Sequence, residues 1–271
     1  MRSTFELRSA RLRVASLDRA GGFYAGVLGL APGAAVANTL ALHAPGQAEP
    51  LLTLVETPGA QPKPSGVPGL FHLALLVPGR AALGRVLLRL AEKNFPLQGL
   101  SDHGVSEAIY LEDPDGNGLE IYADRPRAAW PTAGGKTVLL TRPLNVDALL
   151  ATIPDRQPAG LPAGTMLGHV HLRVQSLEAA EAFYTGELGL AVIVRDIPGA
   201  LFFGADGYHH HVAANLWGRP ANGSGGDYAG LDAFDAGVRD LKAPRTLVDP
   251  EGVRINLTPL TGSSESYRGS S

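Results

Sequence analysis

ARLRVASLDRAGGFYAGVLGL, residues 10–30, matches VHLRVQSLEAAEAFYTGELGL, residues 170–190, at 12 of 21 positions. Agreement of this kind over a constant shift is the mark of an internal repeat. Each copy begins with alternating apolar residues, typical of a strand, and continues into a helix with Ser16 or Ser176 as its N-cap. A Gly-Leu pair and further short strands follow. We therefore predict the same strand–helix–strand–strand–strand unit in both places.

Two more stretches repeat parts of this unit. GLFHLALLVPGRAALGRVLLRLAEKNF (69–95) predicts a strand and a helix, and AIYLEDPDGNGLEIYAD (108–124) closes that copy. The apolar residues of its helix share one stripe, namely Leu83, Val86, Leu87 and Leu90. A last copy, GLDAFDAGVRD to TLVDPEGVRINLTPL (230–260), keeps the Asp-Pro and Gly signature but has no room for a full helix. The chain is thus predicted to be α+β, with four βαβββ units of which the fourth is abbreviated.

The four units fall into two pairs along the chain. We expect residues 1–125 to form a first domain with units one and two, and residues 166–260 a second domain with units three and four. Between them, the Pro- and Gly-rich residues 126–165 read as a linker in which NVDALLATI favours a short helix. The polar residues 261–271 are typical of a flexible tail.

Composition excludes several classes of function. The chain has 271 residues, a formal net charge of -3 and no cysteine. Without a basic run interleaved with aromatics we expect no nucleic-acid partner. Without cysteine there is neither a disulfide framework nor a thiolate ligand, so any metal must be held by His, Asp or Glu. No signal peptide and no run of 18 apolar residues is seen, so we expect a cytoplasmic protein that does not contact a membrane.

The repeated FYxxxLGL signature and the DPDGNGLEIY ending at residues 113–122 carry a family resemblance. The chain resembles the vicinal oxygen chelate superfamily, which includes glyoxalases, bleomycin resistance proteins and extradiol dioxygenases. With SDHGVSEAIY, GHVHLRV and GYHHH it is most similar to the bacterial catechol 2,3-dioxygenase type of ring-cleaving enzyme. The resemblance implies paired, strongly curved mixed sheets and a metal held by the first and last strands of two facing units.

The resemblance places the candidate ligands at equivalent positions of each unit. In unit two these are His72 and Glu120, and in unit three the first-strand position is His169. Units one and four offer only Ser9 with Thr53 and Ala233 with Asn256, respectively, neither of which is a plausible metal-binding pair. Two imidazoles and one carboxylate are the facial set of non-haem Fe(II) sites. This assignment requires units two and three to share a sheet; if units one and two shared it, His169 would lie elsewhere.

Strand alternation gives an independent test of these positions. In LFHLALLV it places His72, Ala74 and Leu76 on one face, and opposite them the bulky set Phe71, Leu73, Leu75 and Val77. In HVHLRV the side chains of His169, His171 and Arg173 share the face toward the cavity, which leaves His171 as a rival ligand. All three proposed ligands fall on the face away from the predicted core. A single histidine near a strand end is, by itself, more often structural than a ligand.

The resemblance also implies catalytic groups around the metal. Tyr110, ten residues before Glu120, stands where ring-cleaving enzymes carry a tyrosine that contacts the substrate, and His103 in SDHG matches their loop histidine at a shorter spacing. Tyr110 could equally serve only packing. A further histidine acts as general acid, and the family pattern HxVA occurs here as His210-His211-Val212-Ala213.

Strand alternation predicts which of the three histidines in GYHHH faces inward. Matching Gly46 with Gly207 makes Ala214 the inward position of the last strand, and His210, four residues earlier, then also faces inward. His209 and His211 are expected to face outward unless the strand starts late. A surface triple without function is the alternative interpretation.

The sequence thus favours a metal-dependent extradiol dioxygenase that acts on a catechol-like aromatic with O2. Fe(II) is the expected metal, with Mn(II), Zn and Ni as alternatives. A glyoxalase-like metal isomerase is the first competing hypothesis, although no second carboxylate is found at Thr53, Ala214 or Asn256. The second is a metal-free protein that binds an aromatic compound or an antibiotic. The oligomeric state, a homo-oligomer included, is left open.

Overall fold

A computed structural model describes residues 4–64, 66–218 and 227–260 of the chain. The predicted tail, residues 261–271, lies outside these ranges. Within them, no helix has the length and apolar character needed to cross a bilayer.

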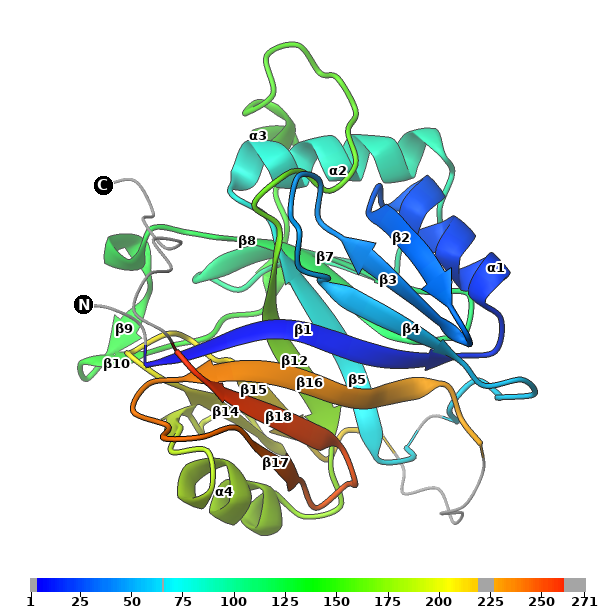
Figure 1. The fold of residues 1–271 in the computed structure, drawn as a ribbon. Helices are drawn as coiled ribbons and strands as arrows, with labels where there is room; N and C mark the ends of the chain where they lie inside the picture. The colour runs from blue at the N-terminus through cyan, green and yellow to red at the C-terminus, as the bar shows by residue number, and fades with distance from the viewer. Residues whose placement is uncertain (1–3, 65, 219–226, 261–271) are drawn as a thin grey trace.

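Four units follow one another in chain order (Figure 1). The first comprises β1 (Phe5–Val14), α1 (Leu17–Gly21), η1 (Gly22–Val27), β2 (Ala31–Val36), β3 (Thr39–His43) and β4 (Leu52–Glu56). The second comprises β5 (Gly69–Leu76), α2 (Arg80–Glu92), β6 (Gly99–Asp102), β7 (Ser106–Glu112) and β8 (Gly118–Asp124). The third comprises β12 (Met166–Arg173), α4 (Leu177–Gly186), β13 (Ala191–Val194), β14 (Ala200–Gly204) and β15 (Val212–Asn215). The fourth comprises β16 (Gly230–Val238), β17 (Arg245–Val248) and β18 (Arg254–Pro259).

The segment between units two and three contains short elements: η2 (Arg127–Ala129), β9 (Thr132–Ala133), β10 (Lys136–Thr137), β11 (Arg142–Pro143) and α3 (Val146–Leu150). The short helix expected within NVDALLATI is therefore present. β11 pairs with β6 and so extends the sheet of unit two. This segment is part of the sheet architecture as well as a connection.

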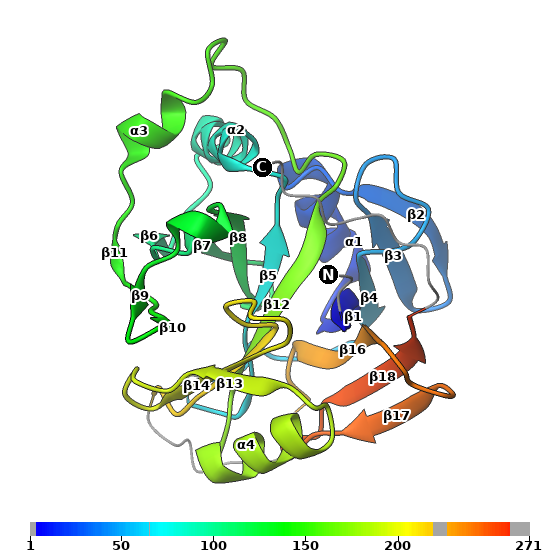
Figure 2. The same ribbon diagram turned by 90° about the vertical axis from the view of Figure 1, so that its left-hand side faces the viewer.

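The two large sheets each combine one unit from either half of the chain. The order β17-β18-β16-β1-β4-β3-β2 joins units four and one, and the order β11-β6-β7-β8-β5-β12-β15-β14-β13 joins units two and three. The central pairs β1–β16 and β5–β12 are antiparallel. Figure 2 shows β5 and β12 side by side in the middle of the molecule. The curled mixed sheets of four repeated units, predicted from the sequence, are confirmed.

Local sequence explains why the helices start where they do. Ser16 accepts a hydrogen bond from the Arg19 amide, and Ser176 from the Ala179 amide, so both predicted N-caps are confirmed. The buried residues of α2 include the predicted stripe, Leu83, Val86, Leu87 and Leu90. Gly84 is buried as well. These side chains pack on the outer face of the sheet.

Buried tyrosines of the FYxxxLGL motifs tie consecutive units together. The hydroxyl of Tyr24 in unit one donates to Asp113 in unit two at 3.0 Å. The equivalent Tyr184 in unit three donates to Asp249 in unit four at 2.8 Å. Both aspartates open the Asp-Pro turns that the sequence repeats. Sheet pairing thus joins units two with three and four with one, while these tyrosines join one with two and three with four.

Two β-bulges interrupt the pairing of β5 with β12. The register passes from Leu167↔Leu75 to His169↔Ala74 and from His171↔His72 to Leu172↔Leu70, so Gly168 and Phe71 are unpaired extra residues. Leu73, Leu75 and Val77 lie in the main core, as alternation predicted. Phe71 does not: it lines the cavity beside His72, because the bulge shifts the alternation by one residue. The prediction for Phe71 was therefore wrong.

Gly168 generates a testable prediction. A Cβ at this position would lie 1.9 Å from the hydroxyl oxygen of Tyr122, which is itself hydrogen-bonded to Tyr208. Gly168→Ala should therefore lower the free energy of unfolding by about 1–3 kcal/mol through overpacking, measured by urea denaturation. Gly186→Ala is the matched control, since a Cβ there meets nothing within 4 Å. Equal stability of the Gly168→Ala protein and the unmodified chain would refute the steric explanation.

Candidate metal centre

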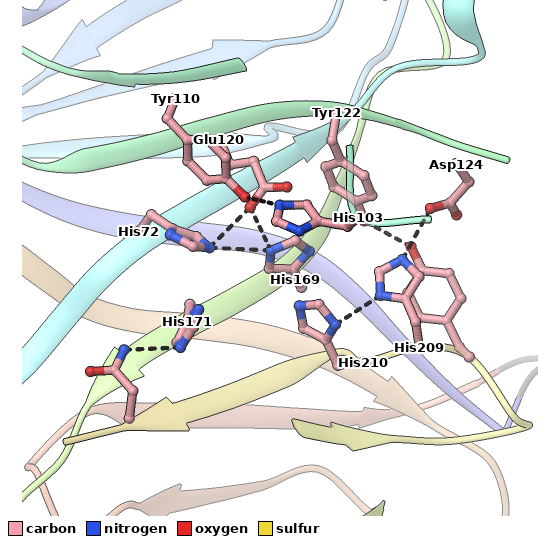
Figure 3. Close-up of polar contacts among 12 residues, drawn as sticks. His72, His103, Tyr110, Glu120, Tyr122, Asp124, His169, His171, His209 and His210 are labelled. Atoms are coloured by element: carbon pink, nitrogen blue, oxygen red, sulfur yellow. Dashed lines mark hydrogen bonds and ion pairs between the residues drawn. The ribbon is translucent and has the colours of Figure 1, made fainter. Parts of the chain in front are cut away.

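Three side chains from different strands of the nine-stranded sheet point at one another (Figure 3). They are His72 on β5, Glu120 on β8 and His169 on β12, and all three are buried. Ala74 pairs with Glu120 on one side and with His169 on the other, and its methyl group leaves room between them. The structure thus brings together the three residues that the sequence singled out as ligands.

Their ligating atoms form a nearly equilateral triangle. Glu120 Oε2 lies 3.0 Å from His72 Nε2 and 3.1 Å from His169 Nε2, and the two Nε2 atoms are 3.3 Å apart. Two ligands at about 2.1 Å from a metal and at right angles to each other are about 3.0 Å apart. The triangle therefore has the dimensions of one face of a metal coordination sphere.

Hydrogen bonds alone cannot account for this triangle. An imidazole nitrogen either donates or accepts, so two Nε2–H groups that both donate to Glu120 leave the contact between His72 and His169 without an acceptor. If either nitrogen lacks its proton, its lone pair faces the carboxylate or the other ring. A cation receives all three lone pairs at once, and the donor set fits a divalent metal.

Burial and mutual proximity set the charges here. Burial raises the pKa of Glu120, but the neighbouring imidazoles His169 and His72 outweigh it and hold this pKa well below its usual value. Burial lowers the pKa of His169 to about 4, against the opposing effect of Glu120. The site thus presents a carboxylate and a neutral imidazole, the protonation states in which both can ligate a metal.

The rival histidine on β12 has another partner. Nε2 of His171 lies 2.9 Å from the side-chain amide nitrogen of Asn215 at the end of β15, and therefore accepts a hydrogen bond from it. His171 faces the same cavity as His169, as alternation predicted. Its Nε2 lone pair is used by Asn215, whereas that of His169 is directed at Glu120.

Tyr110 and His103 form a hydrogen-bonded pair beside the triangle. Nδ1 of His103 lies 2.7 Å from the carbonyl oxygen of Leu140, which can only accept, so Nδ1 carries a proton. In the neutral ring Nε2 is then the acceptor for the hydroxyl of Tyr110 at 2.7 Å. Burial and the Glu120 carboxylate raise the pKa of Tyr110 well above its ordinary value.

Two of the three histidines, His209 and His210, form a buried hydrogen-bonded chain with Asp124, and His211 is partly buried beside them. His210 lines the cavity, and its Nδ1 lies 2.8 Å from Nδ1 of His209, whose Nε2 lies 3.0 Å from a carboxylate oxygen of Asp124. His209 is fully buried, so the expectation that it faces outward was wrong. His211 accepts a hydrogen bond from the Ala205 amide and packs against Phe5.

Alternation could not place this triple because β15 begins only at Val212. His209, His210 and His211 lie in the preceding loop, where side chains do not alternate. The prediction that Ala214 faces inward toward the site was also wrong. Ala214 lies in the main core, whereas Ala213, which pairs with His171, faces the site. The assignment was off by one residue because Gly207 is not the counterpart of Gly46.

The site opens into a cavity of about 620 Å³. Arg173 lines it, as strand alternation predicted. The wall also includes residues that the sequence did not single out: Lys63, Leu139, Leu140, Phe202 and Trp217. Leu139 and Leu140 come from the segment interpreted as a linker. Lys63 carried only the general signal of charge, which does not distinguish a cavity residue from a surface one.

The seven-stranded sheet repeats the frame without the ligands. Its central strands carry bulges at Arg8 and Asp232, matching Gly168 and Phe71. At the equivalent positions the Asp235 carboxylate accepts hydrogen bonds from Ser9 and, at 2.8 Å, from the amide of Asn256. The donors of Ser9 and Asn256 are thus matched by the acceptor oxygens of Asp235.

Comparison with known proteins agrees with the fold and the motifs. The model of the Glyoxalase/Bleomycin resistance protein/Dioxygenase superfamily matches residues 7–121. A catechol-2,3-dioxygenase of Bacillus subtilis (strain 168) is 43% identical over 229 residues, covering 81% of this chain and 79% of that protein.

Solved structures share the architecture at low identity. A Bacillus subtilis protein superposes with a TM-score of 0.62 at 14% identity, over 96% of this chain and 86% of its own. Glyoxalase I from Zea mays superposes with a TM-score of 0.57 at 17% identity, over 95% and 93%. These likenesses show the fold, and the relative with 43% identity shows the family. The chain belongs to the glyoxalase/bleomycin resistance/dioxygenase superfamily.

Proposed function

We propose that this protein is a metal-dependent extradiol dioxygenase, which opens the ring of a catechol-like aromatic with O2. The observation that supports it most is the triangle of His72, Glu120 and His169 at the floor of a cavity that also contains the Tyr110–His103 pair and His210. The 43% identity to a catechol-2,3-dioxygenase points to the same reaction class. A glyoxalase-type fold alone would not choose among chemistries.

His72, Glu120 and His169 would hold the metal, which we propose to be Fe(II), with Mn(II) the next candidate for the same donors. When bound, it supplies the redox chemistry by which O2 and an aromatic diol react, and it favours deprotonation of a coordinated hydroxyl. All three side chains line the cavity, so a metal that they held would be accessible to substrate and O2.

Tyr110 and His103 would orient the diol and accept one of its protons. The Tyr110 hydroxyl donates to Nε2 of His103, so its oxygen lone pairs are free to accept from a substrate hydroxyl. A proton that moves to the Tyr110 oxygen can be passed on to His103 Nε2 along the existing hydrogen bond. The Leu140 carbonyl keeps the imidazole in this orientation.

His210 would transfer a proton at its Nε2 atom. Asp124 fixes the Nε2 proton of His209, so Nδ1 of His209 accepts and Nδ1 of His210 donates. This chain leaves the Nε2 lone pair of His210 toward the cavity. There it can take a proton from the substrate and return it as the ring opens, because burial and the neighbouring histidines lower the pKa of His210 and favour release of that proton.

The competing functions have less support. A glyoxalase-like isomerase uses a second carboxylate as base, whereas the corrected fourth position is Ala213. A metal-free binding protein would have no use for three converging ligand atoms whose contacts protons cannot satisfy. Nor would such a protein need the relay from Asp124 to His210.

If Glu120 is a metal ligand and His210 transfers a proton, substitution of each residue should impair a different property of the protein. Glu120→Ala should lower metal affinity more than about 100-fold, since it removes a ligand whereas changes around ligands already cost 10–100-fold. His210→Ala should keep the metal and lower kcat about 10²- to 10⁴-fold. Metal content after gel filtration, by mass spectrometry, and steady-state kinetics separate the two. Equal metal loss in both variants would make His210 a ligand.

Oxygen consumption tests the reaction itself. Protein purified anaerobically and loaded with Fe(II) should consume one O2 per catechol and form a yellow ring-opened acid. With ¹⁸O2 both oxygen atoms should appear in the product. A thiohemiacetal isomerase assay serves as the comparison, with no turnover expected. If catechol, alkylcatechols and hydroquinones all leave O2 unconsumed while the metal is bound, the dioxygenase proposal fails.

A further inference from the structure

Two cations line the cavity away from the Tyr110–His103 pair. They are Lys63, in the loop before β5, and Arg173, the last residue of β12. We propose that Lys63 and Arg173 form a carboxylate-binding subsite, so that the substrate is a catechol with a carboxylate on a side chain of a few atoms. This inference rests on the proposed function and names its substrate class.

Neither cation has a carboxylate partner among the residues that the structure describes. The acidic side chains in the described cavity wall are Glu112 and Glu120, and neither lies within 4.0 Å of Lys63 or Arg173 in an ion pair. The described chain pairs most of its other half-buried arginines with acids, for example Arg80 with Glu107. Residues 219–226 contain no Asp or Glu in their sequence. Within residues 4–64, 66–218 and 227–260, Lys63 and Arg173 therefore lack a partner of opposite charge.

Both side chains are nevertheless held in place by neutral groups. Lys63 Nζ donates to the Val67 carbonyl at 2.7 Å, and Arg173 Nε donates to the Trp217 carbonyl at 2.5 Å. The guanidinium carbon lies 5.2 Å from the ring centroid of Phe71. Nε is thus used for positioning. The terminal nitrogens of Arg173, which make the two-pronged contact with a carboxylate, have no hydrogen bond to another residue in the part of the chain that the structure describes.

The electrostatic cost of this arrangement points to an anion. Burial and then the charge of Arg173 lower the pKa of Lys63 to about 8, and burial lowers the pKa of Arg173. Two partly buried like charges destabilise each other, and an anion between them would offset that cost. A carboxylate is the group that both can contact through charge-assisted hydrogen bonds.

The distance from the metal centre fits a substituted ring rather than catechol alone. Arg173 lies four residues beyond His169 on β12, about 13 Å along a strand. Phe71 and Trp217, with ring centroids 5.7 Å apart, form an apolar wall near Arg173. An aromatic ring bound at the metal would therefore reach the cations only through a short apolar side chain that ends in the carboxylate.

The test compares two ligands that differ only in charge. Dissociation constants of 3-(3,4-dihydroxyphenyl)propionate and its carboxamide are measured by calorimetry under argon with the metal-loaded protein. We expect the acid to bind about 10-fold more tightly, the range of a charged hydrogen bond reduced for partial exposure. Lys63→Met and Arg173→Met should each weaken binding of the acid much more than binding of the carboxamide, and so remove most of that preference. Lys93→Met, at the exposed end of α2, is the matched control.

The outcomes separate this inference from the proposed function. Equal affinity for acid and carboxamide, or a preference that survives in both variants, would overturn the subsite. Loss of affinity for both ligands in Arg173→Met, with the acid preference intact, would assign Arg173 a purely structural role and also overturn it. If no diol is oxidised yet the charge preference holds and needs both cations, the dioxygenase proposal fails and the subsite stands.

Discussion

The pairing of β5 with β12 is the contact on which the candidate centre depends. It brings residues almost 100 positions apart in the chain, His72 and His169, within 3.3 Å of each other. Straight antiparallel strands would not suffice, because the bulges at Gly168 and Phe71 change which residues face the cavity. Gly168 has no side chain where one would strike Tyr122, and the strand can therefore approach closely enough for His169 to meet Glu120. Main-chain geometry thus determines the shape of the site before any metal enters it.

A carboxylate near the middle of each large sheet is the second constraint, and the two sheets stabilise its charge differently. Ionised Glu120 lies between the imidazoles of His72 and His169, and burial lowers the pKa of His169. A divalent cation would balance the carboxylate charge and satisfy all the lone pairs. In the other sheet the carboxylate of Asp235 accepts hydrogen bonds from the Ser9 hydroxyl and the Asn256 side-chain amide. The same frame therefore supports either a candidate metal centre or a closed hydrogen-bond network, and the choice lies in a few side chains.

Sequence was sufficient for the units and the caps, because each follows from a local pattern that the repeat shows more than once. The family resemblance selected three candidate ligands, which lie together in the structure. His72 and Glu120 stand at fixed places in one copy, and His169 in another. The predictions for Phe71 and His209 failed because they assumed regular alternation of side chains along a strand. Phe71 lies in a bulge, and His209 lies in a loop before a strand that starts late. Asp124 and the cavity wall from the connecting segment were missed because they become neighbours of the centre only through folding.

The alternation of sheet contacts and Tyr–Asp contacts has a consequence for the history of the chain. Units one to four form a closed ring, in which each half of the sequence contributes one unit to each sheet. A half-length chain of two such units could build the same ring only as a homodimer, with two identical centres related by a two-fold axis. After fusion of the two halves, the two centres no longer need to have the same sequence. One centre could then keep its imidazoles and carboxylate. The other, at Ser9, Asp235 and Asn256, could change into a hydrogen-bonded contact with a structural role only.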